Sequence, residues 1–188
     1  MQKQLVSSHQ IAQIVLRCLR DGKSVEIESL GRFRSAGDDS FSFAPPKAPR
    51  IFLAHINEDS AIALKIFARL KAAGLNPWLD KKKLLAGQNW PRAIEKAIRS
   101  SDFFVPCFSK HSLVKRSRFN SELRIALECA EMQPLEEPFL IPVRLEDTII
   151  PAKIADKIQY VDLFPNFEGG VARLVQAIET AAKAKVSS

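Results

Sequence analysis

Glu122 is the side chain whose setting in the sequence best suits chemistry. It lies in segment 117–130, where apolar residues recur at helical spacing: Phe119, Leu123, Ala126, Leu127 and Ala130. At 100° per residue, Glu122 falls at the edge of this stripe, so we expect a half-buried carboxylate on a helix. Such a group can stabilise positive charge that develops on a bound ligand. The alternative is a structural glutamate paired with Arg118, one turn earlier.

Other reactive side chains are less convincing as catalytic groups. Cys107 and His111 are four residues apart, but no third group is evident to orient them. Ser109 and Ser112 have no evident basic partner. His55 suits a ligand contact and a structural role equally well. The sequence contains no G-x-G-x-x-G fingerprint, so a dinucleotide would not bind in the Rossmann manner.

Metal binding and disulfide formation are not expected. The three histidines are scattered without the spacing of metal ligands. The number of cysteines is odd, and none of the three shows C-x-x-C spacing: Cys18, Cys107 and Cys129. These features are typical of reduced cysteines in a cytoplasmic protein.

Composition narrows the class of protein without identifying a partner. The chain of 188 residues is 46% hydrophobic and 26% charged, as in ordinary globular proteins. Its net charge of +7 is divided into +3 in residues 1–50 and +4 in residues 51–188. This even spread does not by itself indicate nucleic-acid binding. No apolar run reaches the roughly 20 residues of a membrane span, so no membrane partner is expected.

The elements that would position Glu122 alternate between strands and helices from residue 51 onward. Strands are expected at 51–55, 76–80, 103–108, 139–145 and 158–162, with helices between them and after the last. This pattern predicts an α/β fold, a five-stranded doubly wound parallel sheet in flavodoxin-like order. Ligands bind beyond the carboxyl ends of such strands, which brings segments 55–59, 80–90 and 109–122 to one edge.

A proline-rich linker at residues 45–50 separates this α/β domain, residues 51–184, from a smaller module. Residues 1–44 begin with an amphipathic helix that ends at Asp21 and Gly22. Short alternating segments around Val25, Phe33 and Phe43 follow, and they are typical of strands. A small N-terminal α+β module is therefore expected.

The second part contains four motif-bearing segments: IFLAHINEDS, GLNPWLDKKKLLAGQNWPRAIEKAIRSSDFFVPCFSKHS, FNSELRIALECA and FLIPVRLED. In this order they resemble bacterial Toll/interleukin-1 receptor (TIR) domains over residues 51–180. The specific feature is the combination of W-L-D, L-x-A-G, A-I-x-S-S-D-F and x-x-x-E-L-x-x-A-L. The resemblance implies the flavodoxin-like TIR fold. It also implies cleavage of the nicotinamide–ribose bond of NAD⁺, as in many bacterial members.

The resemblance also assigns roles to residues. The catalytic glutamate of NAD⁺-cleaving members opens the helix that carries Glu122 here. Loop 84–90 would shape the pocket and meet a neighbouring TIR domain. Catalytic members usually carry an aromatic residue four positions before the glutamate, where this sequence has Arg118 followed by Phe119. The implied substrate-binding residues are His55, Asn57, Asp80, Lys83, Leu85, Gly87, Trp90, Ser109, Arg118 and Phe119.

Two classes of function remain open. The first is an NAD⁺ glycohydrolase that releases nicotinamide and linear or cyclic ADP-ribose, with NAD⁺ as substrate and no further cofactor. Bacterial enzymes of this kind act in antiphage defence or stress signalling. The second is a non-catalytic adaptor that only assembles with other TIR domains. Glu122 favours the enzyme, whereas Arg118 favours the adaptor.

The N-terminal module has a weaker resemblance. Its segments DGKSVEIESLGRF and FSFAPP resemble the front of the HU-type bacterial DNA-binding fold over about 40 residues. The long basic arm of HU proteins is missing, and an acidic turn at residues 37–39 takes its place. We therefore expect at best weak, salt-sensitive DNA binding. A module that docks another TIR or effector protein is at least as well supported.

Overall fold

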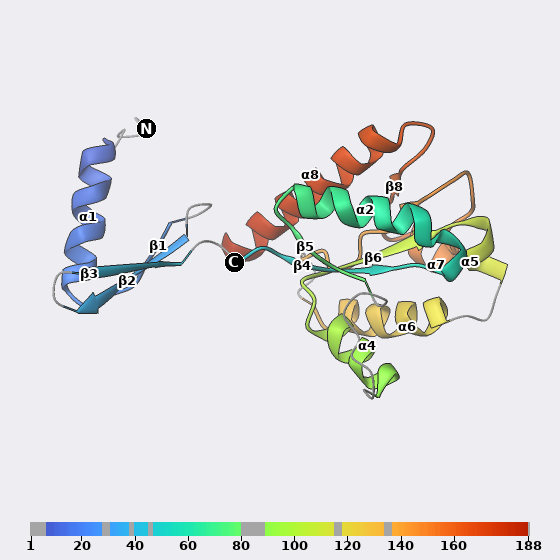
Figure 1. Ribbon diagram of the computed structural model, residues 1–188, viewed down its shortest axis with the longest axis horizontal. Coiled ribbons are helices and arrows are strands. Elements are labelled where there is room, and N and C mark those ends of the chain that lie inside the picture. Colours follow the sequence, from blue (N-terminus) through green and yellow to red (C-terminus); the bar gives the residue numbers. More distant parts are fainter. Residues whose placement is uncertain are drawn as a thin grey trace. The chain divides into compact units, whose positions relative to one another are not determined.

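The computed structural model describes residues 7–27, 31–37, 40–44, 47–79, 89–114, 118–133 and 137–187. The chain forms two compact units, Met1–Lys47 and Ala48–Ser188 (Figure 1). No helix within the described ranges is long and apolar enough to cross a lipid bilayer.

The first unit is a helix followed by a small antiparallel sheet. Helix α1 (Ser8–Arg20) begins with a capping box, in which Ser7 and Gln10 each accept a hydrogen bond from the backbone of the other. Strands β1 (Val25–Ile27), β2 (Gly31–Gly37) and β3 (Ser40–Ala44) pair in that order. At the end of β2, Gly37 has a φ of 86°, a conformation that glycine adopts without strain.

The second unit contains a five-stranded parallel sheet, which confirms the predicted fold class. Its strands are β4 (Arg50–Ala54), β5 (Asn76–Trp78), β6 (Phe103–Phe108), β7 (Val143–Arg144) and β8 (Val161–Asp162). Their order in space is β5-β4-β6-β7-β8, the flavodoxin-like order. The last two strands are shorter than predicted. Before β7 the chain is joined to β6 by a single bridge between Phe104 and Leu140, and Pro106 of β6 lacks the backbone N–H that would continue the ladder from this bridge to β7.

Helices cover both faces of this sheet (Figure 1). Helices α2 (Ser60–Ala72) and α8 (Phe167–Ser187) pack on one face, and α4 (Trp90–Arg99) and α6 (Arg118–Glu131) pack on the other. Three short helices lie in the connections: η1 (Asn57–Asp59), α5 (Lys110–Val114) and α7 (Ala152–Ala155). Each of the three follows a strand, so η1, α5 and α7 lie toward the carboxyl edge of the sheet.

Strand β6 is the centre of the unit, and all six of its side chains are buried. Phe103, Val105 and Cys107 face α2 and α8, whereas Phe104 and Phe108 face α4 and α6. Burial raises the pKa of the Cys107 thiol well above its usual range. A thiol held in its neutral form is a poor nucleophile, so a Cys107–His111 catalytic pair is not supported.

Candidate functional site

Glu122 is held near the carboxyl end of β6 by its own helix. In the first turn of α6, Phe119 packs edge-to-face on Phe108, the last residue of β6, with 5.5 Å between ring centroids. Phe119 is only 2% exposed. Glu122 follows three residues later, which is about 4.5 Å further along the helix axis. The aromatic pair therefore fixes the position of the carboxylate relative to the sheet.

Glu122 is more deeply buried than its place in the sequence predicts. The expected side chain was half-buried, but the structure leaves it 5% exposed. Periodicity places a residue on its own helix, but burial also depends on the elements that pack against that helix, such as α4 against α6. Its place near the carboxyl end of β6, where ligands of doubly wound sheets bind, makes Glu122 a candidate functional residue.

Arg118 and Trp90 come together at the start of their helices. The Arg118 guanidinium carbon lies 3.5 Å from the centroid of the Trp90 ring, a cation–π contact. Asn89 caps α4 by accepting a hydrogen bond from the backbone N–H of Arg92 at 3.3 Å. Trp90 keeps 41% of its surface exposed, and Arg118 is also exposed. The pair thus joins α4 to α6 at the protein surface.

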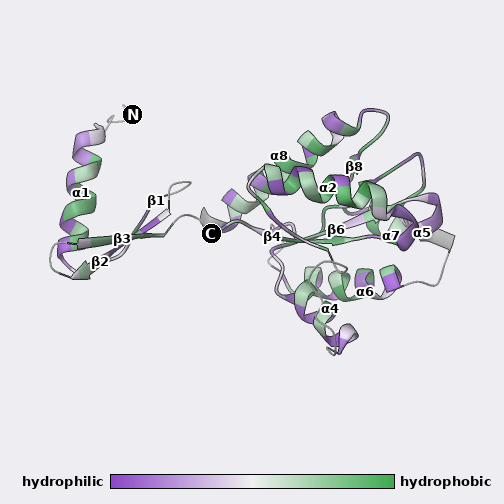
Figure 2. Cartoon of the chain, in the orientation of Figure 1, coloured by the Kyte–Doolittle hydropathy of each residue, from purple (hydrophilic) through white to green (hydrophobic). Residues whose placement is uncertain are grey.

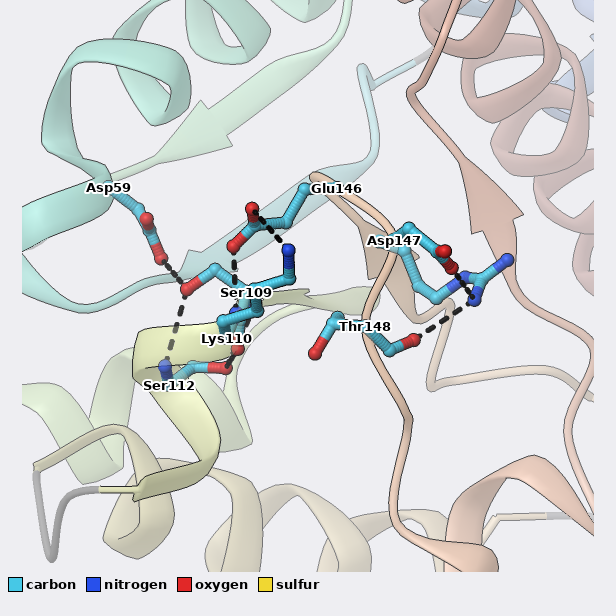
Figure 3. A network of polar contacts seen from close by, with 8 residues as sticks. Asp59, Ser109, Lys110, Ser112, Glu146, Asp147 and Thr148 are labelled. Atoms are coloured by element: carbon cyan, nitrogen blue, oxygen red, sulfur yellow. Dashed lines mark hydrogen bonds and ion pairs between the residues drawn. The ribbon is translucent and has the colours of Figure 1, made fainter.

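A second polar cluster lies where β4 and β6 end (Figure 3). The Ser109 hydroxyl donates a hydrogen bond to Asp59 Oδ2 at 2.7 Å and accepts one from the backbone N–H of Ser112 at 3.2 Å. In return, Ser112 Oγ accepts from the Ser109 N–H at 2.9 Å and donates to the Ser109 carbonyl at 2.8 Å. Ser109 and Ser112 are at most 1% exposed. This arrangement gives Ser109 a positioning role at the end of β6.

The cluster extends to the loop after β7 (Figure 3). The backbone N–H of Lys110 donates to Glu146 Oε1 at 2.9 Å, and Lys110 Nζ lies 3.8 Å from Glu146 Oε2. Arg144 braces this loop by donating to both carboxylate oxygens of Asp162, at 2.6 and 2.8 Å, and to the Thr148 carbonyl. These bonds connect the carboxyl ends of β4, β6 and β7 and fix the shape of the edge.

Asp59 is the electrostatically unusual member of the cluster. Burial raises the pKa of its carboxyl above the ordinary value of 3.8, and proximity to Glu146 adds to this rise. The hydrogen bond from Ser109 and the nearby His111 and His55 oppose the rise without cancelling it. The folded chain therefore binds a proton at Asp59 more tightly than the unfolded chain does.

An Asp59→Asn variant tests whether the negative charge of Asp59 destabilises the folded chain. Between the two pKa values the folded state binds more protons, so the contribution of Asp59 to stability falls as pH rises through this window. Asparagine keeps an acceptor for Ser109 but carries no charge. We expect a higher melting temperature than wild type at pH 7, with the gain shrinking as pH falls through this window and disappearing below about 4.

The matched control is Asp156→Asn, at an exposed position that follows α7. Circular dichroism melts of both variants at neutral and acidic pH provide the measurement. A lower melting temperature for Asp59→Asn at pH 7 would show that the charge stabilises the cluster, contrary to this prediction.

The sequence and the fold together identify the family. The sequence model described as the TIR domain matches residues 51–175. The chain belongs to the TIR domain family. The uncharacterized protein y4cD of Sinorhizobium fredii is 26% identical over 136 residues, which are 72% of this chain and 21% of that protein. The chain therefore spans about a fifth of the length of this relative.

Solved TIR structures share the fold. The TIR domain of the Toll-related receptor TRR-2 from Hydra magnipapillata has a TM-score of 0.53 and 17% identity, covering 67% of this chain and 97% of its own. The TIR-STING receptor from C. gigas, solved in complex with 2′,3′-cGAMP, has a TM-score of 0.56 and 18% identity. That match covers 73% of this chain and 41% of the receptor chain. At these identities the comparison concerns the fold alone.

The predicted site residues of the TIR domain fall into two groups. His55 is half-buried after β4, and Asn57 is exposed in η1. They lie at the same edge as the Ser109 cluster, while Trp90, Arg118 and Phe119 lie around the starts of α4 and α6. Four predicted substrate-binding residues lie outside the described residues: Asp80, Lys83, Leu85 and Gly87.

Sequence reasoning missed three members of the TIR edge. Segment 55–59 was predicted to lie at this edge, but no role was assigned to Asp59, whose side chain makes no cap bond to α2 and accepts a hydrogen bond from Ser109. Ser112 and Glu146 were not predicted to bind other residues. The available signal was their position just after strands, because polar residues there gather at one edge. Within the described residues, no group of three or more His, Cys, Asp or Glu side chains is arranged to hold a metal ion.

Proposed function

We propose that this TIR domain cleaves the nicotinamide–ribose bond of NAD⁺, with Glu122 as its catalytic residue. The observation that supports the proposal is a 5% exposed carboxyl side chain near the carboxyl end of β6. Ligands of doubly wound sheets bind at this edge. A carboxylate at this edge can stabilise positive charge that develops on a bound ligand.

The chemistry requires little beyond one carboxylate. The bond between ribose C1′ and the pyridinium nitrogen breaks, and its electron pair neutralises the pyridinium, so nicotinamide leaves without being protonated. Positive charge develops on the ribosyl group, as in glycoside hydrolysis. Glu122 would stabilise that charge and accept hydrogen bonds from the ribose hydroxyls. Attack of water on C1′ and loss of one proton then give ADP-ribose.

Substrate binding would draw on groups around this carboxylate. Arg118 is exposed at the start of α6 and is suited to the NAD⁺ pyrophosphate. His55 and Asn57 would contact the ligand from the β4 side. The four predicted residues in segment 80–87 would complete the pocket. We also propose that loop 84–90 meets a second TIR domain, so that activity requires assembly.

One observation favours the alternative of a non-catalytic adaptor. The Arg118 guanidinium lies over one face of the Trp90 ring, 3.5 Å from its centroid. This contact covers a surface on which a nicotinamide or adenine ring would otherwise stack. An adaptor would keep the TIR fold and its assembly but would not release nicotinamide.

The test is incubation of the purified chain with NAD⁺ at several protein concentrations, with nicotinamide and ADP-ribose measured by chromatography. We expect equimolar release of the two products, or of nicotinamide and a cyclic product. Specific activity should rise with protein concentration if assembly completes the site. Absence of nicotinamide release from protein that is assembled would support the adaptor. Constant specific activity across the dilution series would contradict the requirement for assembly but not the proposed cleavage of NAD⁺.

A further inference from the structure

The starts of α4 and α6 bring an aromatic ring and a cation together beside the proposed site. The Arg118 guanidinium carbon lies 3.5 Å from the centroid of the Trp90 ring. Trp90 is the first residue of α4, which Asn89 caps and in which Pro91 comes next, so its backbone is well held. Arg118 is the first residue of α6. It lies one helical turn before Glu122 and on the same side of that helix.

Both side chains of this pair are accessible to a ligand. Trp90 keeps 41% of its surface exposed, and Arg118 is exposed as well. The other tryptophan of the chain, Trp78, is half-buried and stacks on Phe52 with 4.6 Å between ring centroids. Figure 2 shows both hydrophilic and hydrophobic residues along α4 and α6, as expected for helices with one face on the sheet and one toward solvent. Trp90 is therefore the tryptophan that a ligand can reach.

The charge around this pair is positive. Arg92 is exposed and lies in the first turn of α4, close in sequence to Trp90. Neither α4 nor α6 has an acidic residue in its first turn. A ligand that carries negative charge is therefore attracted to the place where Arg118 meets Trp90.

The face of Trp90 that holds a guanidinium also suits a pyridinium. Both groups are flat cations, and tryptophan binds cations on the face of its ring. In NAD⁺ the nicotinamide ring is a pyridinium, and its bond to ribose is the one on which Glu122 is proposed to act. Arg118 and the nicotinamide ring would therefore compete for one face. The pyrophosphate of the same ligand offers Arg118 another partner, since a guanidinium forms charge-assisted, bidentate hydrogen bonds with phosphate oxygens.

We propose that Arg118 moves from Trp90 to the pyrophosphate when NAD⁺ binds, and that the nicotinamide ring takes its place on Trp90. This exchange rests on the proposed function and explains how the contact between Arg118 and Trp90 is compatible with it. An exposed cation–π contact is weak, and a bidentate contact with phosphate is stronger, so the exchange is favourable. The site then selects a ligand that carries both a pyridinium and a phosphate. Nicotinamide riboside has the same ring and the same bond but no phosphate, and it leaves Arg118 on Trp90.

The emission of Trp90 gives a test that does not depend on activity. Inorganic pyrophosphate is titrated into the full chain, with sodium chloride at equal ionic strength as control, and Trp90→Phe identifies the part of the signal that comes from Trp78. We expect pyrophosphate to change the emission of Trp90 in wild type but not in Arg118→Gln. The matched variant is Arg124→Gln, because Arg124 is exposed on another side of α6, and it should behave as wild type. Unchanged emission of wild type at millimolar pyrophosphate, or an equal change in Arg118→Gln, would overturn the proposal.

Steady-state release of nicotinamide tests the selectivity. Arg118→Gln should lower kcat/KM for NAD⁺ at least about tenfold, mainly through KM, because a charge-assisted hydrogen bond is lost. The same variant should leave kcat/KM for nicotinamide riboside unchanged or higher, and Arg124→Gln should match wild type with both substrates. Equal losses with both substrates in Arg118→Gln would overturn the exchange. If wild type releases no nicotinamide from NAD⁺, the proposed function fails, whereas the pyrophosphate titration still decides whether Arg118 leaves Trp90.

Discussion

Replacing Glu122 by glutamine should lower the rate of NAD⁺ cleavage about 100- to 1,000-fold. Glutamine keeps the shape of the side chain but removes the negative charge opposite the developing ribosyl cation. The loss corresponds to about 3–4 kcal/mol of transition-state stabilisation and should appear in kcat rather than in KM. Steady-state nicotinamide release by wild type and variant provides the measurement.

The burial of Glu122 makes a stability control necessary. At 5% exposure, a substitution there reaches the packing between α4 and α6 as well as the site. We expect the melting temperature to change by about 4 °C or less, roughly 1 kcal/mol for a chain of this size. Glu128→Gln is the matched variant, because Glu128 lies on the same helix with 57% of its side chain exposed and pairs with Arg99. Equal activity in the two variants, or a large loss of stability confined to Glu122→Gln, would make Glu122 a structural residue.

The sheet order was predictable from sequence because each strand is short, apolar and followed by a helical segment. β6 illustrates this, since a short run of six apolar residues bounded by polar segments predicts a strand buried on both faces, and all six are buried. The start of the fourth strand was harder to predict. Residues 139–145 fit one apolar strand by hydropathy, but Pro142, and Pro106 in the neighbouring β6, lack the N–H donors that a continuous ladder needs, and β7 comprises only Val143–Arg144.

The site was less predictable because side-chain burial depends on neighbours that are distant in sequence. The position of Glu122 on its helix indicated the edge of a stripe, whereas its 5% exposure depends on the elements that pack against α6 in the folded chain. The side-chain partner of Asp59 was hard to predict for the same reason. The hydrogen-bond partner of its carboxylate, Ser109, lies 50 residues away in the sequence. Such long-range contacts leave no local pattern.

Substitution of Gly170 tests how tightly α8 packs against the end of β8. It is buried in the first turns of α8, where the helix crosses the end of β8. A Cβ at this position would lie 2.6 Å from the Asp162 carbonyl oxygen and 2.7 Å from Leu163 Cα. Both are backbone atoms, so the strand or the helix would have to move.

Gly170→Ala should therefore destabilise the fold, although glycine to alanine in a helix ordinarily gains up to about 1 kcal/mol. Overpacking against backbone costs about 1–3 kcal/mol or more, and we expect a net loss of about 2 kcal/mol, or a fall of roughly 4–8 °C in melting temperature. The adjacent Gly169→Ala is the control, since its Cβ would meet the Asn166 side chain at 2.9 Å, and that side chain can rotate away. Thermal melts of the pair isolate the cost of backbone contact from the gain in helix propensity. If Gly170→Ala melts at or above the temperature of Gly169→Ala, α8 is free to shift away from β8 and this edge of the sheet is not rigidly packed.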